Sequence, residues 1–288
     1  METTLNLSTV LYRRPATPAR KQGGLGTLFR PVDLIHGSCW RAILAFACPI
    51  ILSYLLQQIY TISDAAIVGQ TLTAQEVAGV NDTSALIFIF LQFAFGVSAG
   101  FCSVTSCRVG AHDDAGIRRS LAVQFLLSGI LTVLLTALAL ALLDPMLAWI
   151  NVTPESGEVY RAAHTYCAVI FAGIGAQLFY NFVCSFLRSM GDSATPLAFL
   201  LFSTVLNVGL DLLFILSFRW GVAGAAFATV TAQLISTVGC FLYAFRRYPQ
   251  LRLTKADWRF PRHEVTRHLI QGVPLGLQFS VLAVGIIV

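Results

Sequence analysis

Two acidic side chains lie inside long apolar stretches of this 288-residue sequence. Of its fourteen acidic residues, Asp64 and Asp211 are the two that fall within segments apolar enough to cross a membrane. An ionisable group in hydrocarbon costs at least ~2.5 kcal/mol, so it usually faces a water-filled cavity or a partner. No lysine or arginine in these segments can pair with Asp211. Two carboxylates with neutral oxygens nearby are suited to bind a hard monovalent cation or to share a proton.

Further oxygen-bearing side chains are expected at the same depth. Asn207 precedes Asp211 by four residues, so both project from one helix face, about 6 Å apart along the axis. Thr229 lies as far after a turn centred near Trp220 as Asp211 lies before it, and an antiparallel helix pair would bring the two to similar depth. Because the first span runs in the same direction, Asp64 reaches the same half of the membrane. We therefore predict a cation site formed by Asp64, Asn207, Asp211 and Thr229.

Polar residues also recur at helical spacing along three of these segments. Such a stripe normally faces a cavity between helices rather than lipid. Two alternatives stay open: the stripes could form interhelical hydrogen bonds, and Asp64 could lie at the membrane interface near its helix end. The predicted cavity-lining residues are Ser53, Gln57, Tyr60, Thr61, Gln177, Asn181 and Gln233.

The composition indicates that the solvent of these segments is lipid. Hydrophobic residues make up 56% of the chain and charged residues 11%, where a soluble chain carries about a quarter charged. Each apolar run is continuous and reaches the roughly 20 residues that a membrane helix needs, whereas barrel strands alternate. We therefore predict an all-α integral membrane protein, a six-helix transmembrane bundle plus part of a seventh helix. The predicted spans are 43–67, 84–107, 121–143, 162–187, 196–217 and 222–245, with the seventh beginning near residue 269.

The basic residues indicate how the chain is oriented in the membrane. Most of the nineteen Lys and Arg precede the first span or follow the second, fourth and sixth, whereas only Arg161 and Arg219 lie on the other side. The positive-inside rule then places the N-terminus in the cytoplasm of a multi-pass cell-membrane protein. The net charge of +5 is a topology signal and does not indicate nucleic-acid binding. The predicted units are a cytoplasmic arm (1–40), a six-helix lobe (41–245), a basic cytoplasmic loop (246–268) and the first helix of a truncated second lobe (269–288).

A weak internal repeat supports the expectation of a second lobe. Pro49 and Pro274 each lie early in a span that follows a basic stretch, as a duplicated six-helix unit would give. The sequence ends inside an apolar run, so we expect it to be truncated; the alternative is a seven-helix protein that ends at Val288. Within the second span, Gly96 and Gly100 form a small-xxx-small pattern that favours close helix contact.

Signatures of enzymes and of metal sites are missing from the sequence. It contains no Gly-rich phosphate loop, no HExxH and no GxSxG, so we predict no enzyme and no ATP-driven transport. The seven cysteines form no CxxC pair, and the five histidines lie in loops or at span ends, where we expect them to be interface residues. We therefore expect no transition-metal site, no disulfide and no cofactor apart from a coupling ion.

An ordered set of motifs resembles the multidrug and toxic-compound extrusion family. The first span ends Tyr60-Thr61-Ile62-Ser63-Asp64, and a later loop reads Leu187-Arg188-Ser189-Met190-Gly191-Asp192. Gly110-Ala111 is similar to the end of the family's Gln-xx-Gly-Ala loop, although Ser106-Cys107 departs from it. The resemblance covers about residues 40–288, and its segments are 49–69, 110–111, 187–192 with Pro196, 207–211, and 221–226 with Thr229.

The resemblance implies a twelve-helix antiporter of two lobes that exports drugs or organic cations in exchange for Na⁺ or H⁺. Its cation site would correspond to Asp64, Asn207, Asp211 and Thr229. As a mechanism, we expect the first span to bend near Pro49 or at its outer end when a cation or proton binds. The expected partners are a small-molecule substrate, membrane lipid and the missing second lobe, with no nucleic acid. Three alternatives are a lipid-linked oligosaccharide flippase of the same superfamily, a membrane-embedded enzyme, and an inert fragment. A flippase would show cationic residues for a pyrophosphate, and the predicted spans contain none.

Overall fold

The computed structural model describes residues 39–254, 257–258 and 260–287, and this part of the chain is helical with no strands. The predicted arm 1–40 lies almost entirely outside the described residues. Six helices are long and apolar enough to cross a membrane, and a bent pair would make a seventh span. The fold class is therefore that of an all-α membrane protein. The elements are α1 (Cys39–Thr71), α2 (Ala74–Gly110), α3 (Asp114–Ala141), α4 (Leu143–Trp149), η2 (Pro154–Ser156), α5 (Glu158–Ala172), α6 (Ile174–Ser189), α7 (Ala194–Asp211), η3 (Leu212–Ser217), α8 (Gly221–Arg247), η4 (Pro249–Leu251) and α9 (Arg262–Ile287).

Helix α2 begins at Ala74, well before the predicted start at residue 84. Thr73 and Glu76 form a capping box: the Thr73 N–H donates to Glu76 Oε2 at 2.9 Å, and the Glu76 N–H donates to Thr73 Oγ1 at 3.4 Å. These bonds satisfy amides that have no partner within the helix. The first turns are polar, so hydropathy alone missed them.

The predicted fourth span, 162–187, is covered by two helices rather than by one continuous helix. Helices α5 and α6 are bent by 43° at Gly173. A Cβ at Gly173 would lie 2.4 Å from Val230 Cγ2, so the missing side chain lets α8 pack directly against the bend.

Helix α9 begins at Arg262, rather than near residue 269. His268, which we expected at the membrane interface, is fully buried, and that expectation is wrong. The cause is a polar contact with α2 and α3 that the sequence did not indicate, described further below.

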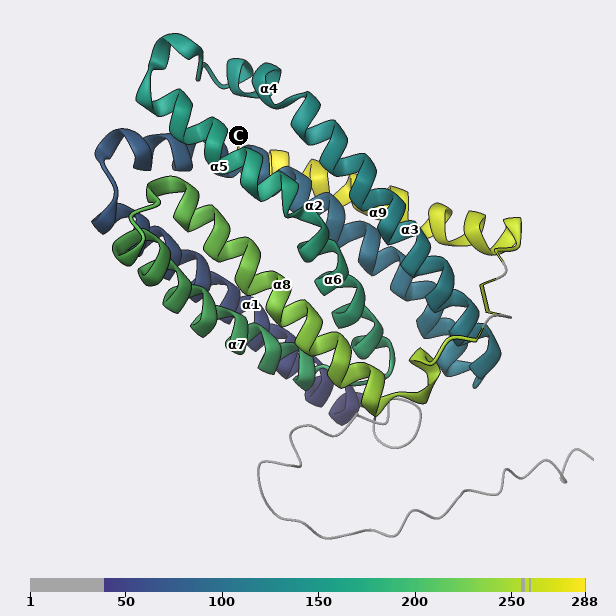
Figure 1. Cartoon of the computed structure of the whole chain (residues 1–288). Coiled ribbons are helices and arrows are strands. Elements are labelled where there is room, and N and C mark those ends of the chain that lie inside the picture. The colour runs from purple at the N-terminus through teal and green to yellow at the C-terminus, as the bar shows by residue number, and fades with distance from the viewer. Residues whose placement is uncertain (1–38, 255–256, 259, 288) are drawn as a thin grey trace, which may run out of the picture.

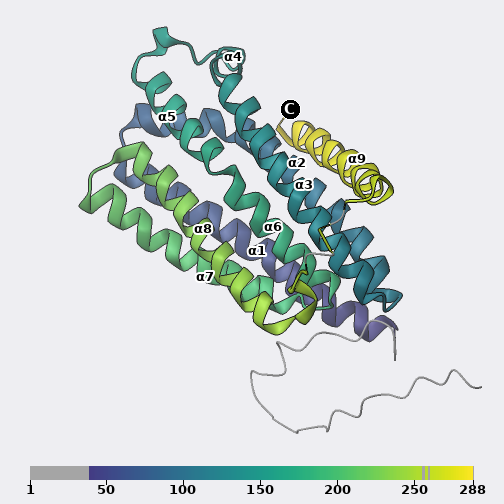
Figure 2. The same cartoon turned by 45° about the vertical axis from the view of Figure 1, so that its right-hand side comes forward.

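The helices are arranged around a centre formed by α2, α5 and α6. Helices α1, α7 and α8 lie on one side of this centre, and α9 lies on the other, beside α2 and α3 (Figures 1 and 2). Helix α1 packs mainly against α7, and only 6% of its most apolar window is buried. It is therefore the least anchored of the long helices.

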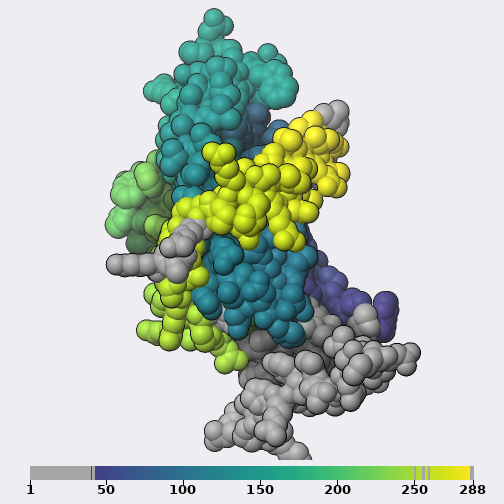
Figure 3. Space-filling view, turned by 90° about the vertical axis from the view of Figure 1, so that its right-hand side faces the viewer, coloured from purple at the N-terminus to yellow at the C-terminus, as the bar shows by residue number. Residues whose placement is uncertain are grey.

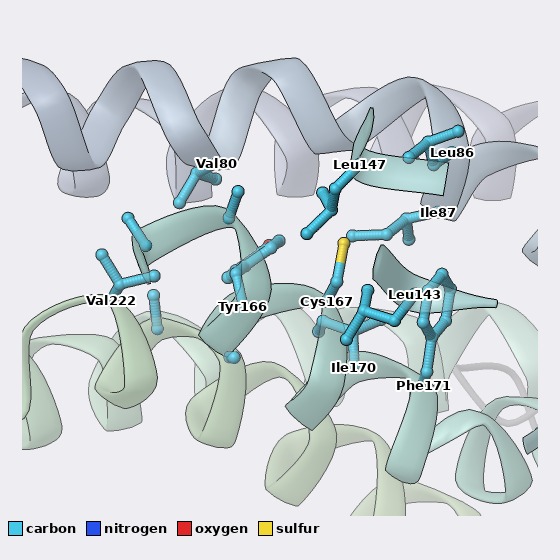
Figure 4. Packing of buried hydrophobic residues seen from close by; sticks show 14 of the residues in the cluster. Val80, Leu86, Ile87, Leu143, Leu147, Tyr166, Cys167, Ile170, Phe171 and Val222 are labelled. Atoms are coloured by element: carbon cyan, nitrogen blue, oxygen red, sulfur yellow. The ribbon is translucent and has the colours of Figure 1, made fainter. Parts of the chain in front are cut away.

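The largest hydrophobic cluster joins α2, α5 and α8 (Figure 4). Val80 and Ile87 of α2 belong to it together with Phe171 of α5, and Val222 extends the cluster onto α8. Tyr166 of α5 lies within this cluster. The packing fixes α5 and the start of α8 relative to one another, next to the polar residues described below.

The two ends of the bundle differ in charge. One end carries the last turns of α2, α6 and α8 and the start of α3, and we call it the basic end; its basic residues are Arg108, Arg118, Arg119, Arg188, Arg246 and Arg247. Here Arg118 lies 3.6 Å from Asp257. Burial alone would raise the pKa of the Asp257 carboxyl, but hydrogen bonds from Thr254 and the nearby guanidinium groups lower it below its ordinary value of 3.8.

Candidate cation site

Two polar side chains are fully buried on one face of α7. Asn207 and Asp211 are each 0% exposed. Neither polar atom of the Asn207 amide has a hydrogen-bond partner, and neither does either carboxylate oxygen of Asp211. Leaving a buried polar group without a partner costs about 1–3 kcal/mol, and more when it is charged. The arrangement is therefore unfavourable unless a bound ligand or proton compensates it.

Asp64 from α1 and Thr229 from α8 complete the group. Asp64 Oδ1 and Thr229 Oγ1 are also buried without a partner. The carboxyl groups of Asp64 and Asp211 are neighbours in the structure. The structure thus places Asp64, Asp211 and Thr229, from three helices, around Tyr60, while Asn207 lies one turn before Asp211 on α7. Within the described residues, the four residues named from the sequence hold six of the ten buried side-chain N and O atoms that lack a partner.

Two tyrosines border these four residues. Tyr60 lies one turn before Asp64 on α1, and its side chain is near Thr229 and both carboxyl groups. Tyr166, from α5, is near Asp64, Asp211 and Tyr60. Sequence reasoning missed Tyr166, because a tyrosine on an otherwise apolar helix has the pattern of a core residue. Its position in the hydrophobic cluster (Figure 4) places an apolar wall beside the carboxyl groups.

The predicted lining residues of α1 satisfy part of their hydrogen bonding within their own helix. Ser53 Oγ donates to the Pro49 carbonyl at 2.8 Å, and Thr61 Oγ1 donates to the Gln57 carbonyl at 3.0 Å. The acceptor of the Ser53 bond is the carbonyl of Pro49, the residue at which we expect α1 to bend. In this structure α1 continues through Pro49 as one helix. Gln57 and Thr61 are exposed in this structure. Ser53 is buried, so the α1 stripe is open only in part, at Gln57 and Thr61.

The lining residues of α6 and α8 lie deeper in the bundle. Asn181 is 7% exposed, and its Nδ2 has no hydrogen-bond partner. Gln177 and Gln233 are half-buried. Nothing in the geometry assigns these three side chains to a particular ligand, and their role in lining a cavity stays a prediction.

The donor set decides what the site could hold. Two carboxylates, an amide oxygen and a hydroxyl are hard oxygen ligands, which suit an alkali cation. The same paired carboxyl groups can hold one shared proton. Within the described residues, no three His, Cys, Asp or Glu side chains come together as a transition-metal site would require.

Comparison with known sequences gives one family and several relatives. The MatE family model matches residues 49–213, which is more than half of the chain. The probable multidrug resistance protein YpnP of Bacillus subtilis (strain 168) is 31% identical over 88% of this chain and 56% of its own length. The probable multidrug resistance protein YoeA of the same organism is 29% identical over 77% of this chain and 48% of its own length. The chain thus spans about half the length of these relatives.

Solved structures of transporters share this fold. An outward-facing multidrug resistance MATE family transporter of the MOP superfamily superposes with a TM-score of 0.78 and 26% identity, over 88% of this chain and 56% of the other. An inward-facing conformation of a multidrug resistance MATE family transporter gives a TM-score of 0.72 and 25% identity, over 81% of this chain and 54% of the other. The agreement extends over most of the described helices.

Proposed function

Because this chain belongs to the MatE family, we propose that it forms the cation-binding half of a membrane exporter that moves drugs or organic cations out of the cell in exchange for Na⁺ or H⁺. The observation that carries the proposal is the group of six unpartnered polar atoms on Asp64, Asn207, Asp211 and Thr229. A second six-helix lobe would complete the drug cavity, since the relatives are about twice as long. A flippase for anionic lipid-linked sugars is not favoured, because the site carries carboxylates.

The exchange cycle follows from the electrostatics of the site. A cation or proton that binds between Asp64 and Asp211 neutralises charge in a region with an apolar wall, where charge is costly. Helix α1 carries Asp64 and has the least buried surface of the long helices, so it can shift at low cost when the site changes occupancy. Drug and cation then compete because they favour different positions of α1.

The orientation in the membrane is also proposed. The basic end would face the cytoplasm of a multi-pass cell-membrane protein, with the N-terminus on the same side. The site lies toward the opposite end of the bundle, since Asp64 precedes the α1 terminus at Thr71 by about two turns.

Asp211→Asn tests the proposal in the full-length protein reconstituted in proteoliposomes. An imposed Na⁺ or H⁺ gradient should drive drug export by the wild type. The export rate of the variant should be at least about tenfold lower, which corresponds to ~1.4 kcal/mol in activation free energy. Asp82→Asn is the matched control, because Asp82 is an exposed acid of α2 and its replacement should leave export unchanged. Gradient-driven export that Asp211→Asn leaves intact would sink the proposal.

A further inference from the structure

Helix α9 approaches the rest of the bundle through glycines. It packs chiefly on α2, with a smaller contact to α3, and lies across the blue-teal surface in the space-filling view (Figure 3). A Cβ at Gly100 would lie 2.5 Å from the Gln271 carbonyl oxygen, and one at Gly96 would lie 2.7 Å from the Leu275 carbonyl oxygen. The close contact predicted for the Gly96 and Gly100 pattern is confirmed. Small residues bring the two backbones together without interlocking side chains.

A buried ion pair closes this contact at the basic end. Arg108 of α2 forms a salt bridge with Glu264 in the first turn of α9, and it also donates to the Gly116 carbonyl of α3. Arg108 is 9% exposed and Glu264 is 5% exposed. A buried ion pair gives little net stability over an apolar contact, but removing one partner leaves a costly unpaired charge. The pair therefore adds little to the stability of the α2–α9 contact, but the energy of the contact depends strongly on whether both partners stay paired.

His268 extends the polar contact one turn further along α9. Its Nδ1 lies 2.8 Å from the Glu264 carbonyl oxygen, and its Nε2 lies 2.7 Å from Ser120 Oγ of α3. Ser120 Oγ is 2.8 Å from Thr105 Oγ1, which also accepts from Gln124. One connected set of hydrogen bonds thus joins α9, α3 and α2. We call this set, together with the Arg108–Glu264 pair, the α2–α9 seam.

Hydration decides how strong the seam is. While the groups are dry, their hydrogen bonds and ion pair act in a low dielectric and hold α9 in place. Once water reaches them, the ion pair becomes a surface salt bridge that contributes little stabilisation energy. The glycine contact has no interlocking side chains that would hold α9 against α2. The seam is therefore stable when closed and weak once opened.

We propose that the α2–α9 seam is a latch that closes the basic end while the cation site is open to the other side, and that it separates when the bundle changes access. The inference rests on the proposed exchange function, because a latch requires a protein that alternates between two openings. Neutralisation of the cation site should favour the state in which the latch is open, if that state is the one that binds the cation or proton more tightly.

A cysteine reporter inside the seam tests the latch. Thr105 is 1% exposed, so Thr105→Cys should react slowly with an impermeant maleimide added at the basic end of inverted vesicles, in a background whose native cysteines are replaced. Glu264→Gln should raise the labelling rate at least about tenfold. Asp82→Asn is the matched control, because Asp82 is an exposed acid of α2, and this acid-to-amide change should leave the rate unchanged.

Two further variants separate a latch from a static contact. Asp211→Asn, with the seam intact, should raise labelling at least about threefold, whereas a merely structural contact would not respond to the distant site. If Glu264→Gln fails to insert, Ser120→Ala leaves the ion pair in place, removes the hydroxyl that joins α3 to His268, and should still raise labelling about threefold. Unchanged labelling in Asp211→Asn overturns the latch, and so does unchanged labelling in Glu264→Gln or, in its place, Ser120→Ala.

Parallel export measurements distinguish the two proposals. Labelling needs no transport, so a seam that responds as expected while export does not depend on Asp211 would refute the exchange function. Export that requires Asp211 while labelling stays constant in all variants would refute the latch alone.

Discussion

Asp211→Asn is expected to raise the stability of the protein when no coupling ion is bound. The Asp211 carboxylate is 0% exposed with both oxygens unpartnered, so its replacement removes a buried charge without removing a hydrogen bond. An unsatisfied buried polar group costs about 1–3 kcal/mol and a charged one costs more, so the amide keeps the first cost and removes the additional cost of the charge. The free energy of unfolding should increase by about 1 kcal/mol or more, and the unfolding temperature by a few degrees. The gain should shrink as the pH falls, because protonation also removes the charge.

Thermal unfolding in detergent, with and without Na⁺, measures both the stability of the ion-free protein and the stabilisation that a bound ion adds. Binding to the folded protein alone stabilises it by about 2.7 kcal/mol at one hundred times the dissociation constant. The wild type should gain this with Na⁺ or, if the coupling ion is H⁺, with a fall in pH, whereas the variant should gain neither. Asp82→Asn should behave as the wild type in every condition.

Two results would refute the reasoning. A variant less stable than the wild type without ions would mean that Asp211 has structural partners in the folded protein. An ion-dependent stabilisation that survives in the variant would mean that the coupling ion binds elsewhere.

Three further predictions concern stability. Gly100→Ala should destabilise the protein by about 1–3 kcal/mol, because its Cβ would collide with the backbone of α9, whereas Gly129→Ala has open space around it and should stabilise α3 by up to about 1 kcal/mol in the same unfolding assay. Thr73→Ala should cost about 1 kcal/mol through loss of the α2 cap, with Thr73→Ser as the control that keeps it. Because the pKa of Asp257 is lowered in the folded protein, its carboxylate contributes to the free energy of unfolding at pH values above the ordinary pKa of 3.8. This contribution is lost as the pH falls through the lowered pKa. Asp257→Asn should therefore be less stable than the wild type at neutral pH, and pH-dependent unfolding should show the difference vanish in acid.

The membrane spans could be predicted because length and apolar character are properties of a local stretch of sequence. Local polarity also caused the errors. The charged residues around Glu264 and His268 have the pattern of a loop, yet contact with Arg108 and Ser120 buries them and lets α9 begin at Arg262. A partner so far along the chain leaves no trace in a local window.

Most of the candidate site could be predicted for a different reason. A carboxylate inside an apolar helix is rare, and helix geometry relates its depth to that of Asn207 and Thr229. Tyr166 could not be identified, because its ring belongs to the core and only its position beside Asp64 gives it a polar role. The bend at Gly173 depends on Val230, which no spacing within the fourth span could indicate.

The segment η3 (Leu212–Ser217) follows Asp211 directly and is a π-helix. A π turn holds one residue more than the α turn it replaces, which is how an inserted residue is absorbed without breaking a helix. Length changes in the hairpin between α7 and α8 can therefore be absorbed beyond the carboxylate. Residues before Leu212 keep their position around the α7 axis. Insertions or deletions at this end of the bundle therefore do not rotate the face that carries Asn207 and Asp211. A deletion of one residue within 212–217 should be tolerated far better than a deletion within 203–210.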